Sequence, residues 1–204
     1  MRINLFPGLT VALIFVCAAS SALAQTVPAA TESNLPLAVG AGFSGYNPDF
    51  GHGHLQGGAL WIDYFPNQVP QRLQGLGIEI EARDLSIGRS STQPANLRQD
   101  TAEGGLIYSW RRFHNVHPYG KFLMGFGNTD YEYGALARRG HDSRTITVVG
   151  GGADIRVFKR IWARADYEYE FWPDFFKVTN PGGVMTPQGF TVGVLYRFGG
   201  RPAR

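Results

Sequence analysis

Residues 161–171 read Ile-Trp-Ala-Arg-Ala-Asp-Tyr-Glu-Tyr-Glu-Phe, and this stretch decides the fold class. Every second residue from Ile161 to Phe171 is apolar or aromatic, while the residues between them are mostly charged. Successive side chains of a β-strand point to opposite faces, so only a strand separates these two sets. The stretch therefore predicts a sheet with one apolar face and one charged face.

The same period of two dominates the rest of the chain after the first 34 residues. It is clear in residues 76–83, 102–113, 119–127, 145–157 and 190–198, and weaker in 35–46 and 55–65, where glycine and alanine dilute it. Together with residues 161–171 these stretches give eight candidate strands. The sequence therefore predicts an all-β chain.

The connections between the candidate strands alternate in length. Long connections, rich in Gly, Pro, Asn, Asp and Arg, fall near 47–54, 88–100, 128–143 and 172–187, and shorter ones near 66–74, 114–118 and 158–160. Bacterial outer-membrane barrels have an even number of strands, short periplasmic turns and long external loops. The pattern predicts an eight-stranded antiparallel up-and-down transmembrane β-barrel with both termini in the periplasm.

The N-terminus has the three parts of a secretory signal. Arg2 supplies the positive charge, residues 9–19 are almost entirely apolar, and Ala22-Leu23-Ala24 is a small-x-small cleavage site. We expect a signal peptide over 1–24, a flexible lead over 25–34, the barrel over 35–199 and a short tail over 200–204. The single cysteine, Cys17, would leave with the signal, which excludes disulfides and thiol chemistry from the mature protein.

Alternation alone fits a soluble sandwich or a lipocalin-like barrel as well as a membrane barrel. In a membrane barrel the apolar face meets lipid and the charges turn inward. The charged faces carry both signs in near balance, six bases against seven acids, as a filled lumen requires. The sequence predicts a lumen ion-pair network of Glu79, Glu81, Arg83, Glu103, Arg111, Lys121, Asp154, Arg156, Arg164, Asp166, Glu168, Glu170 and Arg197.

Aromatic residues gather near the predicted strand ends, where their amphipathic rings suit a bilayer interface. The predicted periplasmic girdle is Tyr64, Phe65, Trp110, Phe113, Trp162, Tyr196 and Phe198. The predicted outer girdle is Tyr46, Tyr131, Tyr133, Phe171, Trp172 and Phe190.

Four segments carry a resemblance to a known family: residues 118–127 (PYGKFLMGFG), 150–154 (GGGAD), 167–169 (YEY) and 193–198 (GVLYRF). Their arrangement resembles the outer-membrane β-barrel family that includes the OmpA transmembrane domain, OmpX and the opacity-type porin-like proteins. The resemblance implies an outer-membrane location in a Gram-negative bacterium and recognition of the C-terminal aromatic residue by the barrel-assembly machinery. Here residues 199–204 follow that aromatic, Phe198. No peptidoglycan-binding domain follows, so that role of OmpA does not carry over.

Eight strands leave an interior just wide enough for side chains, which disfavours a general diffusion pore. We expect a non-enzymatic barrel with a structural or surface-interaction role through its external loops; a narrow channel and a lipid A-modifying enzyme are the alternatives. Some eight-stranded barrels are lipid A deacylases with a His-x-Ser pair on a lipid-facing strand. His141-Asp142-Ser143 has that spacing, but Arg144 and Thr145 follow where those enzymes have Asn-Ala-Gly, and the pair is predicted to lie in a loop. We therefore expect no catalytic residues.

Expected partners follow from the remaining charges. Arg138, Arg139 and Arg144 would lie at the depth of lipopolysaccharide phosphates, which the planar guanidinium binds in pairs. The formal net charge of +3 gives no argument for nucleic acid. His52 and His54 lack third and fourth ligands, so we expect no metal and no cofactor. We expect a monomer in the lipid of the outer membrane.

Overall fold

The computed structural model describes residues 36–49, 54–66, 69–87, 97–133, 138–177 and 180–198. The predicted signal peptide, N-terminal lead and C-terminal tail lie outside these ranges, as do His52 and residues 88–96 of the predicted loop 88–100. Within the described ranges, no helix is long and apolar enough to cross a membrane.

The described chain is built almost entirely of strands. They are β1 (Leu37–Asn47), β2 (Leu55–Tyr64), β3 (Leu76–Ser86), β4 (Leu97–Ser109), β5 (Val116–Tyr133), β6 (Arg138–Arg156), β7 (Ile161–Lys177), β8 (Asn180–Met185) and β9 (Gln188–Phe198). A short 3-10 helix, η1 (Gln71–Leu73), lies in the connection between β2 and β3.

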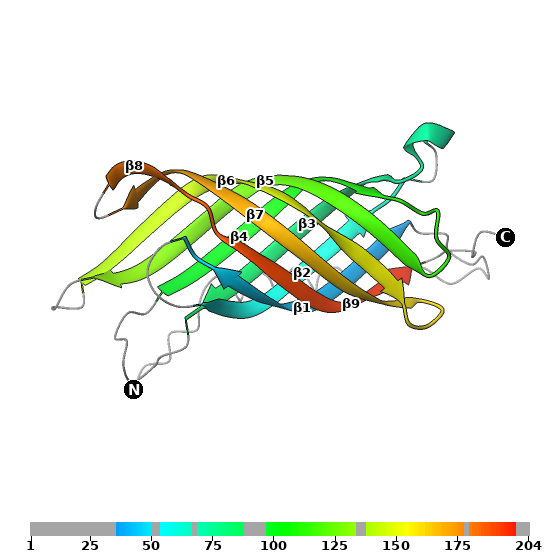
Figure 1. Cartoon of the computed structure of the whole chain (residues 1–204), viewed down its shortest axis with the longest axis horizontal. Coiled ribbons are helices and arrows are strands. Elements are labelled where there is room, and N and C mark those ends of the chain that lie inside the picture. The colour runs from blue at the N-terminus through cyan, green and yellow to red at the C-terminus, as the bar shows by residue number, and fades with distance from the viewer. Residues whose placement is uncertain are drawn as a thin grey trace, which may run out of the picture. The chain divides into compact units, whose positions relative to one another are not determined.

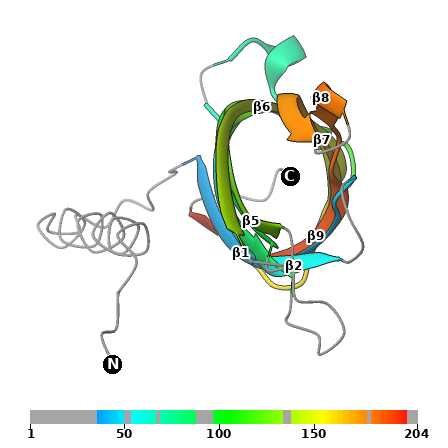
Figure 2. The same cartoon turned by 90° about the vertical axis from the view of Figure 1, so that its left-hand side faces the viewer.

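The strands close into a barrel (Figures 1 and 2). Each strand from β1 to β7 pairs with the next, β7 also pairs with β9, and β9 returns to β1, all antiparallel. The ninth strand, β8, pairs with the end of β7 and lies outside this ring of eight. The predicted eight-stranded antiparallel up-and-down barrel is therefore confirmed. Closure leaves no unpaired sheet edge within the wall.

The barrel has two different ends. Residues 110–115, residues 157–160 and the segment with η1 join strands at one end, called the turn end here. The β5–β6 and β7–β8 hairpins extend at the other, called the loop end (Figure 1). Two predicted loops are largely strand: β5 runs on to Tyr133, β6 begins at Arg138, and β7 and β8 occupy most of 172–187. Polar side chains in these segments hid the strand pattern, although their backbones pair.

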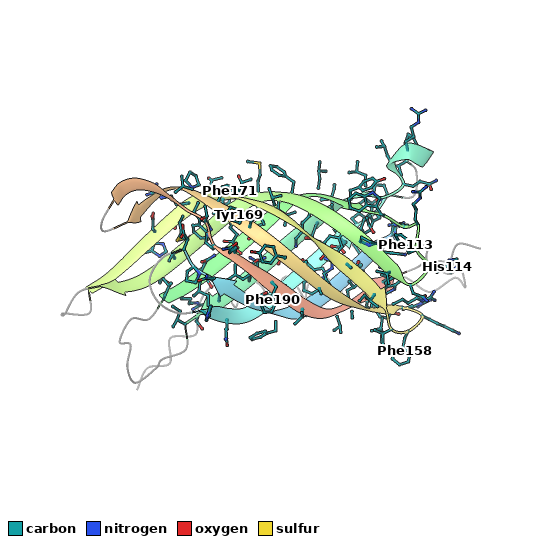
Figure 3. The ribbon with its side chains drawn as sticks, viewed as in Figure 1. Phe113, His114, Phe158, Tyr169, Phe171 and Phe190 are labelled. Atoms are coloured by element: carbon teal, nitrogen blue, oxygen red, sulfur yellow. The ribbon has the colours of Figure 1, made fainter. Side chains whose placement is uncertain are left out.

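The two faces of the wall differ in polarity. In β3, Glu79 is 0% exposed while its neighbour Ile80 is 59% exposed. Outward residues such as Phe43, Leu60 and Phe126 are likewise apolar. Figure 3 shows labelled aromatic side chains on the barrel, Tyr169 and Phe171 toward the loop end and Phe113 and Phe158 toward the turn end. This is the reverse of a soluble barrel and the arrangement that lipid requires.

Four residues of the predicted girdles, Tyr46, Phe65, Trp162 and Trp172, are buried instead. Strand alternation places them on the inner face, where their rings or polar groups contact lumen side chains. The guanidiniums of Arg83 and Arg197 lie over the rings of Tyr46 and Trp162, at 4.5 and 4.0 Å from the centroids. The side chains of Tyr131 and Tyr133 are outside the described part.

Apolar clusters inside the barrel lie toward both ends. Toward the loop end these are Leu123, Ile146, Val148, Trp172 and Met185, and Tyr46, Leu55, Leu85 and Leu97. Toward the turn end they are Ala38, Ala59, Trp61, Trp162 and Leu195, and Phe65, Ile107 and Tyr119. The large rings need glycines beside them: a Cβ on Gly127 would lie 2.1 Å from the Trp172 ring, and one on Gly40 would lie 2.3 Å from Trp61.

Candidate functional site

The barrel interior holds a layer of charged side chains between the apolar clusters. Arg164 of β7 is its centre toward the turn end. Its guanidinium reaches three carboxylates on three other strands: Asp63 Oδ2 at 2.6 Å, Glu79 Oε2 at 2.7 Å and Asp154 Oδ1 at 2.8 Å. The guanidinium also lies over the Tyr119 ring, 4.6 Å from its centroid. A planar cation with several donors suits such a site.

Lys121 of β5 is the second centre. Its ammonium Nζ lies 2.9 Å from Glu79 Oε1, 2.8 Å from Glu81 Oε2 and 2.9 Å from Asp166 Oδ2, and it also contacts Glu168. The side chain is only 1% exposed. The buried ammonium is therefore fully paired. Its four carboxylates outnumber it, and Glu79, Glu81 and Glu168 also bind Arg164 or Arg83.

Arg83 of β3 is the third centre. It binds Glu81 Oε1 at 2.7 Å and Glu170 Oε1 at 2.6 Å, and it also contacts Glu168. Glu168 accepts a hydrogen bond from the Tyr46 hydroxyl. Glu170 Oε2 accepts two more, from Gln99 Nε2 at 2.9 Å and from Trp172 Nε1 at 2.7 Å.

Shared carboxylates join the three centres into one network. Glu79 links Arg164 to Lys121, while Glu81 and Glu168 each link Lys121 to Arg83. Since β3 and β7 are not neighbours in the barrel, these pairs tie separated parts of the wall together across the lumen. The arrangement fills and braces the interior.

The structure places most of the predicted lumen residues in this layer, including Glu103. Arg197 joins from the turn end through Asp154 Oδ2 at 2.7 Å. Arg111 and Arg156 do not belong to the buried set: Arg111 lies exposed in the turn after β4, and Arg156 is the half-buried last residue of β6. The predicted near balance is therefore wrong, because two of its six bases are outside the layer.

Sequence reasoning missed several members of the layer. Asp63 is buried beside Arg164, and Tyr119 donates to Asp166 Oδ2 at 2.8 Å. Asp63 lies on β2, where glycines dilute the alternation, and it shares the inner face with Ala59 and Trp61. Strand parity applied to β2 could have found it.

Glu103 of β4 differs from its neighbours. It is 3% exposed, lies directly opposite Glu81 in the β3–β4 ladder, and neither carboxyl oxygen has a hydrogen-bond partner. A buried carboxylate without a donor is costly. The layer thus carries one acid that its buried cations do not bind directly.

A polar band crosses the outer face of β3 to β6 near the loop end. The β4–β5 and β5–β6 ladders align Arg98 with Asp130, Asp130 with His141, and Asn128 with Ser143. The structure thus corrects the placement of His141 and Ser143: they lie on β6, exposed, and not in a loop. Polarity at the end of a long hairpin was mistaken for irregular structure.

Hydrogen bonds connect the side chains of this band. His141 Nδ1 lies 2.6 Å from Asp130 Oδ1, and His141 Nε2 lies 3.1 Å from Ser143 Oγ. Ser143 Oγ is also 2.6 Å from Asn128 Oδ1. All four side chains are exposed on the outer surface.

The three arginines predicted to contact lipopolysaccharide lie on β6. Arg144 alternates with Ser143, so it lies on the other face of the strand, with Nε 3.0 Å from Asp142 Oδ1. Arg138 and Arg139 begin the strand, and their side chains are outside the described part. These residues too were predicted to lie in a loop.

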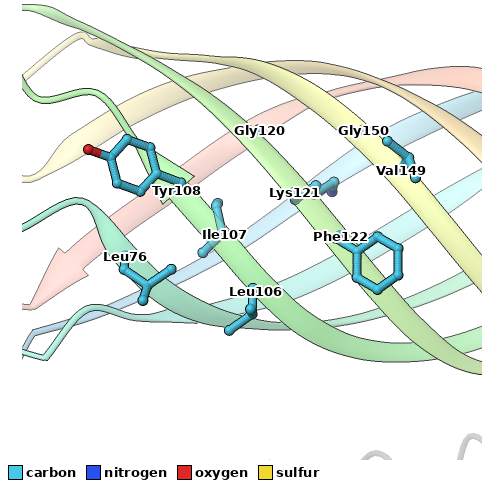
Figure 4. A pocket seen from close by; sticks show the side chains of 9 residues that line it. All are labelled: Leu76, Leu106, Ile107, Tyr108, Gly120, Lys121, Phe122, Val149 and Gly150. Atoms are coloured by element: carbon cyan, nitrogen blue, oxygen red, sulfur yellow. The ribbon is translucent and has the colours of Figure 1, made fainter. Parts of the chain in front are cut away.

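Toward the turn end from the polar band, the outer face of β3 to β6 has a shallow hollow (Figure 4). Leu106, Phe122 and Val149 border it, and Gly120 leaves it open. Its apolar lining suits hydrocarbon. Across the described ranges, no cluster of three or more His, Cys, Asp or Glu side chains is arranged to hold a metal ion.

Comparisons with known proteins agree with this architecture. A family model described as the outer membrane protein beta-barrel domain matches residues 11–198. No curated protein sequence matches the chain.

Solved structures of the same fold include Neisserial surface protein A, with a TM-score of 0.59 and 13% identity over 79% of this chain and 96% of that one. Ail, the attachment invasion locus protein of Yersinia pestis, has a TM-score of 0.53 and 18% identity over 79% and 96%. OprG from Pseudomonas aeruginosa has a TM-score of 0.53 and 13% identity over 80% and 96%. At these identities the likeness establishes the fold alone.

Proposed function

Since the chain belongs to the family of outer membrane β-barrel domains, we propose that it is a closed, non-conducting barrel that acts through its surface-exposed loop end. The buried network of Arg83, Lys121 and Arg164 carries this proposal. Each of these cations contacts at least three carboxylates, and apolar clusters lie on both sides of the layer. A lumen filled with side chains in this way disfavours conduction, so the geometry favours a structural or surface role over a narrow channel.

The proposed orientation puts the loop end outside the cell. Barrels of this family have short periplasmic turns and longer external segments. The turns at 110–115 and 157–160 are short, whereas the β5–β6 and β7–β8 hairpins extend beyond the wall. In this orientation the loop end faces lipopolysaccharide, neighbouring cells or a host surface. Such a role would be like the one that the name attachment invasion locus describes for Ail.

We propose lipopolysaccharide as the first partner of the loop end, through the predicted set Arg138, Arg139 and Arg144. Arg138 and Arg139, at the end of the hairpin, carry the proposal, since Arg144 lies on the face of β6 opposite to Ser143 and is paired with Asp142. Guanidinium groups bind phosphate oxygens in pairs, and β6 carries these residues to the end of the long hairpin. The matched arginines at the opposite end are Arg72, Arg111 and Arg112.

The experiment compares two triple variants of the protein purified from outer membranes. Replacing Arg138, Arg139 and Arg144 by Gln should lower the co-purified lipopolysaccharide and make the residual binding less sensitive to salt. Replacing Arg72, Arg111 and Arg112 by Gln should leave both unchanged. Equal retention of lipopolysaccharide by the two variants would contradict the assignment.

A further inference from the structure

We infer that Asp130, His141 and Ser143 form a serine-hydrolase centre on the outer surface of the barrel, and that it cleaves carboxylic esters of outer-leaflet lipids. This goes beyond the proposed surface role, since it adds a reaction. It also revises the expectation of a non-enzymatic chain at one of its two grounds, the placement of His141 and Ser143 in a loop; the other, that Arg144 and Thr145 follow Ser143, stands.

The three side chains have the connectivity that a nucleophilic serine requires. Asp130 Oδ1 is 2.6 Å from His141 Nδ1, and His141 Nε2 on the other side of the ring is 3.1 Å from Ser143 Oγ. Both distances fall within hydrogen-bond reach, and the acid, the base and the hydroxyl follow one another in the order of a Ser-His-Asp triad. Such a constellation is recognised by its geometry, whatever fold carries it.

Strand register fixes this geometry. His141 and Ser143 are two residues apart on β6, so both point outward, and Asp130 lies directly across the ladder from His141. Directly opposite residues on paired strands have Cβ atoms about 5 Å apart, which lets short side chains meet. The centre therefore stands on two paired strands, a firmer support than a loop.

Asn128, which lies across from Ser143, completes the arrangement. In the structure Ser143 Oγ donates a hydrogen bond to the side-chain oxygen of Asn128, Oδ1, at 2.6 Å. A half-turn of the amide exchanges its oxygen and nitrogen, and the amide then donates to Ser143 Oγ. This frees the hydroxyl proton to point at His141 Nε2, while Nδ1–H donates to Asp130.

The position of the centre on the barrel indicates the substrate. Phe126, the next outward residue of β5 after Asn128 toward the turn end, is 71% exposed. Met124 and Phe122 follow it on the same face, and the hollow at Gly120 comes next (Figure 4). The triad thus stands at the boundary between a polar band and an apolar face. A lipid whose acyl chains lie along this face brings its ester groups to the level of Ser143.

A bound lipid would also exclude water from the triad, which the exposed side chains cannot do by themselves. The side chains of Asp130 and His141 are 59% and 61% exposed, so bulk water or a lipid surface covers them, and a lipid would exclude the water. The β6–β7 ladder begins at Thr147, so in the described chain residues 138–146 of β6 pair with β5 alone. Backbone N–H groups on this free edge can donate to an oxyanion.

The reaction is a two-step hydrolysis. Ser143 Oγ attacks the ester carbonyl carbon while its proton passes to His141 Nε2. The bond from that carbon to the alkoxy oxygen breaks, the leaving alcohol takes the proton, and an acyl-serine remains. Water then attacks the acyl carbon, gives a proton to His141, and releases the carboxylic acid as the proton returns to Ser143. Asp130 orients the imidazole throughout.

The test uses the full-length barrel, folded in detergent micelles, with p-nitrophenyl dodecanoate and a fluorophosphonate probe. Ser143→Ala should lower hydrolysis on the order of a thousandfold and abolish labelling, because removing a triad member leaves little more than binding. Thr145→Ala is the matched control, since this exposed hydroxyl shares the strand and face of Ser143. Asp130→Asn should also slow hydrolysis while keeping the serine.

Vesicle assays identify the lipid. Fatty acid released from lipopolysaccharide, or from phosphatidylethanolamine, in a manner that requires Ser143 supports the inference and names the source. Equal rates for the parent and Ser143→Ala, both folded by their shift in gel mobility on heating, would overturn the centre. Ser143-dependent cleavage of the p-nitrophenyl ester with neither lipid cleaved would overturn the lipid assignment. These readouts are independent of lipopolysaccharide retention by the arginine variants.

Discussion

The guanidinium of Arg164 on β7 binds Glu79 on β3 across the lumen, with Nη1 2.7 Å from Oε2 and both side chains buried. The two strands are not neighbours in the wall, so this pair braces the barrel as well as neutralising two charges. Breaking a buried ion pair from one side leaves an uncompensated charge in the interior.

Reversing Arg164 to Glu should therefore destabilise the barrel. The new carboxylate would face Asp63, Glu79 and Asp154 without a partner, at a cost of about 3–5 kcal/mol. Urea unfolding in lipid vesicles measures the change. Arg72→Glu makes the same charge change at an exposed position and should shift stability by well under about 1 kcal/mol. Equal effects of the two variants would show that the network contributes nothing to stability.

Neutralising Glu103 should not destabilise the barrel, in contrast to reversing Arg164. This buried carboxylate has no hydrogen-bond donor and faces Glu81, so Glu103→Gln should leave the unfolding free energy unchanged or raise it. Glu79→Gln removes a partner of both Lys121 and Arg164 and should lower it by a few kcal/mol. The same urea titration compares them, and a Glu103 variant as unstable as the Glu79 variant would refute the distinction.

Val192 tests whether the apolar outer face meets lipid. It lies in the middle of β9, 47% exposed, with Val194 and Phe190 beside it on the same face. Val192→Arg should cost about 2–4 kcal/mol in a bilayer, since the guanidinium would lie in hydrocarbon. Unfolding in vesicles reports the loss. Stability equal to that of the parent would mean that this face never contacts lipid.

The orientation can be tested with single cysteines, because the one natural cysteine, Cys17, precedes the predicted cleavage site. A membrane-impermeant maleimide added to intact cells should label Val184→Cys, which is exposed on β8 at the loop end. It should label His114→Cys, in the turn after β4, only after the cells are broken. Labelling of His114→Cys on intact cells would reverse the proposed topology.

The eight strands of the wall, their closure and most of the inward charges followed from the sequence because the period of two is strong in most strands. Residues 161–171 alternate without a break, and the structure pairs all of them within β7. The sequence did not predict that the ends of the long hairpins are strands. Their outward residues Asn128, Asp130, His141 and Ser143 are polar, because they lie beyond the apolar part of the wall. There polarity no longer separates a strand from a loop.

The inward aromatics were missed for a related reason. Residue type suggested that Tyr46, Trp162 and Trp172 face a bilayer interface, whereas strand parity puts them inside. Inside the lumen their rings cover cations and their polar groups bind carboxylates, so the interior satisfies them as well as an interface would. The identity of each ion pair depends on shear between distant strands, which no local pattern encodes.

Ion conductance across a planar lipid bilayer tests most directly whether the lumen is closed. Protein reconstituted from detergent, with insertion verified by flotation of proteoliposomes, should give no stable conductance steps above the protein-free membrane, because the Arg83, Lys121 and Arg164 network and the apolar clusters occupy the interior. Reproducible single-channel openings of the parent protein would contradict a closed lumen and favour a narrow channel.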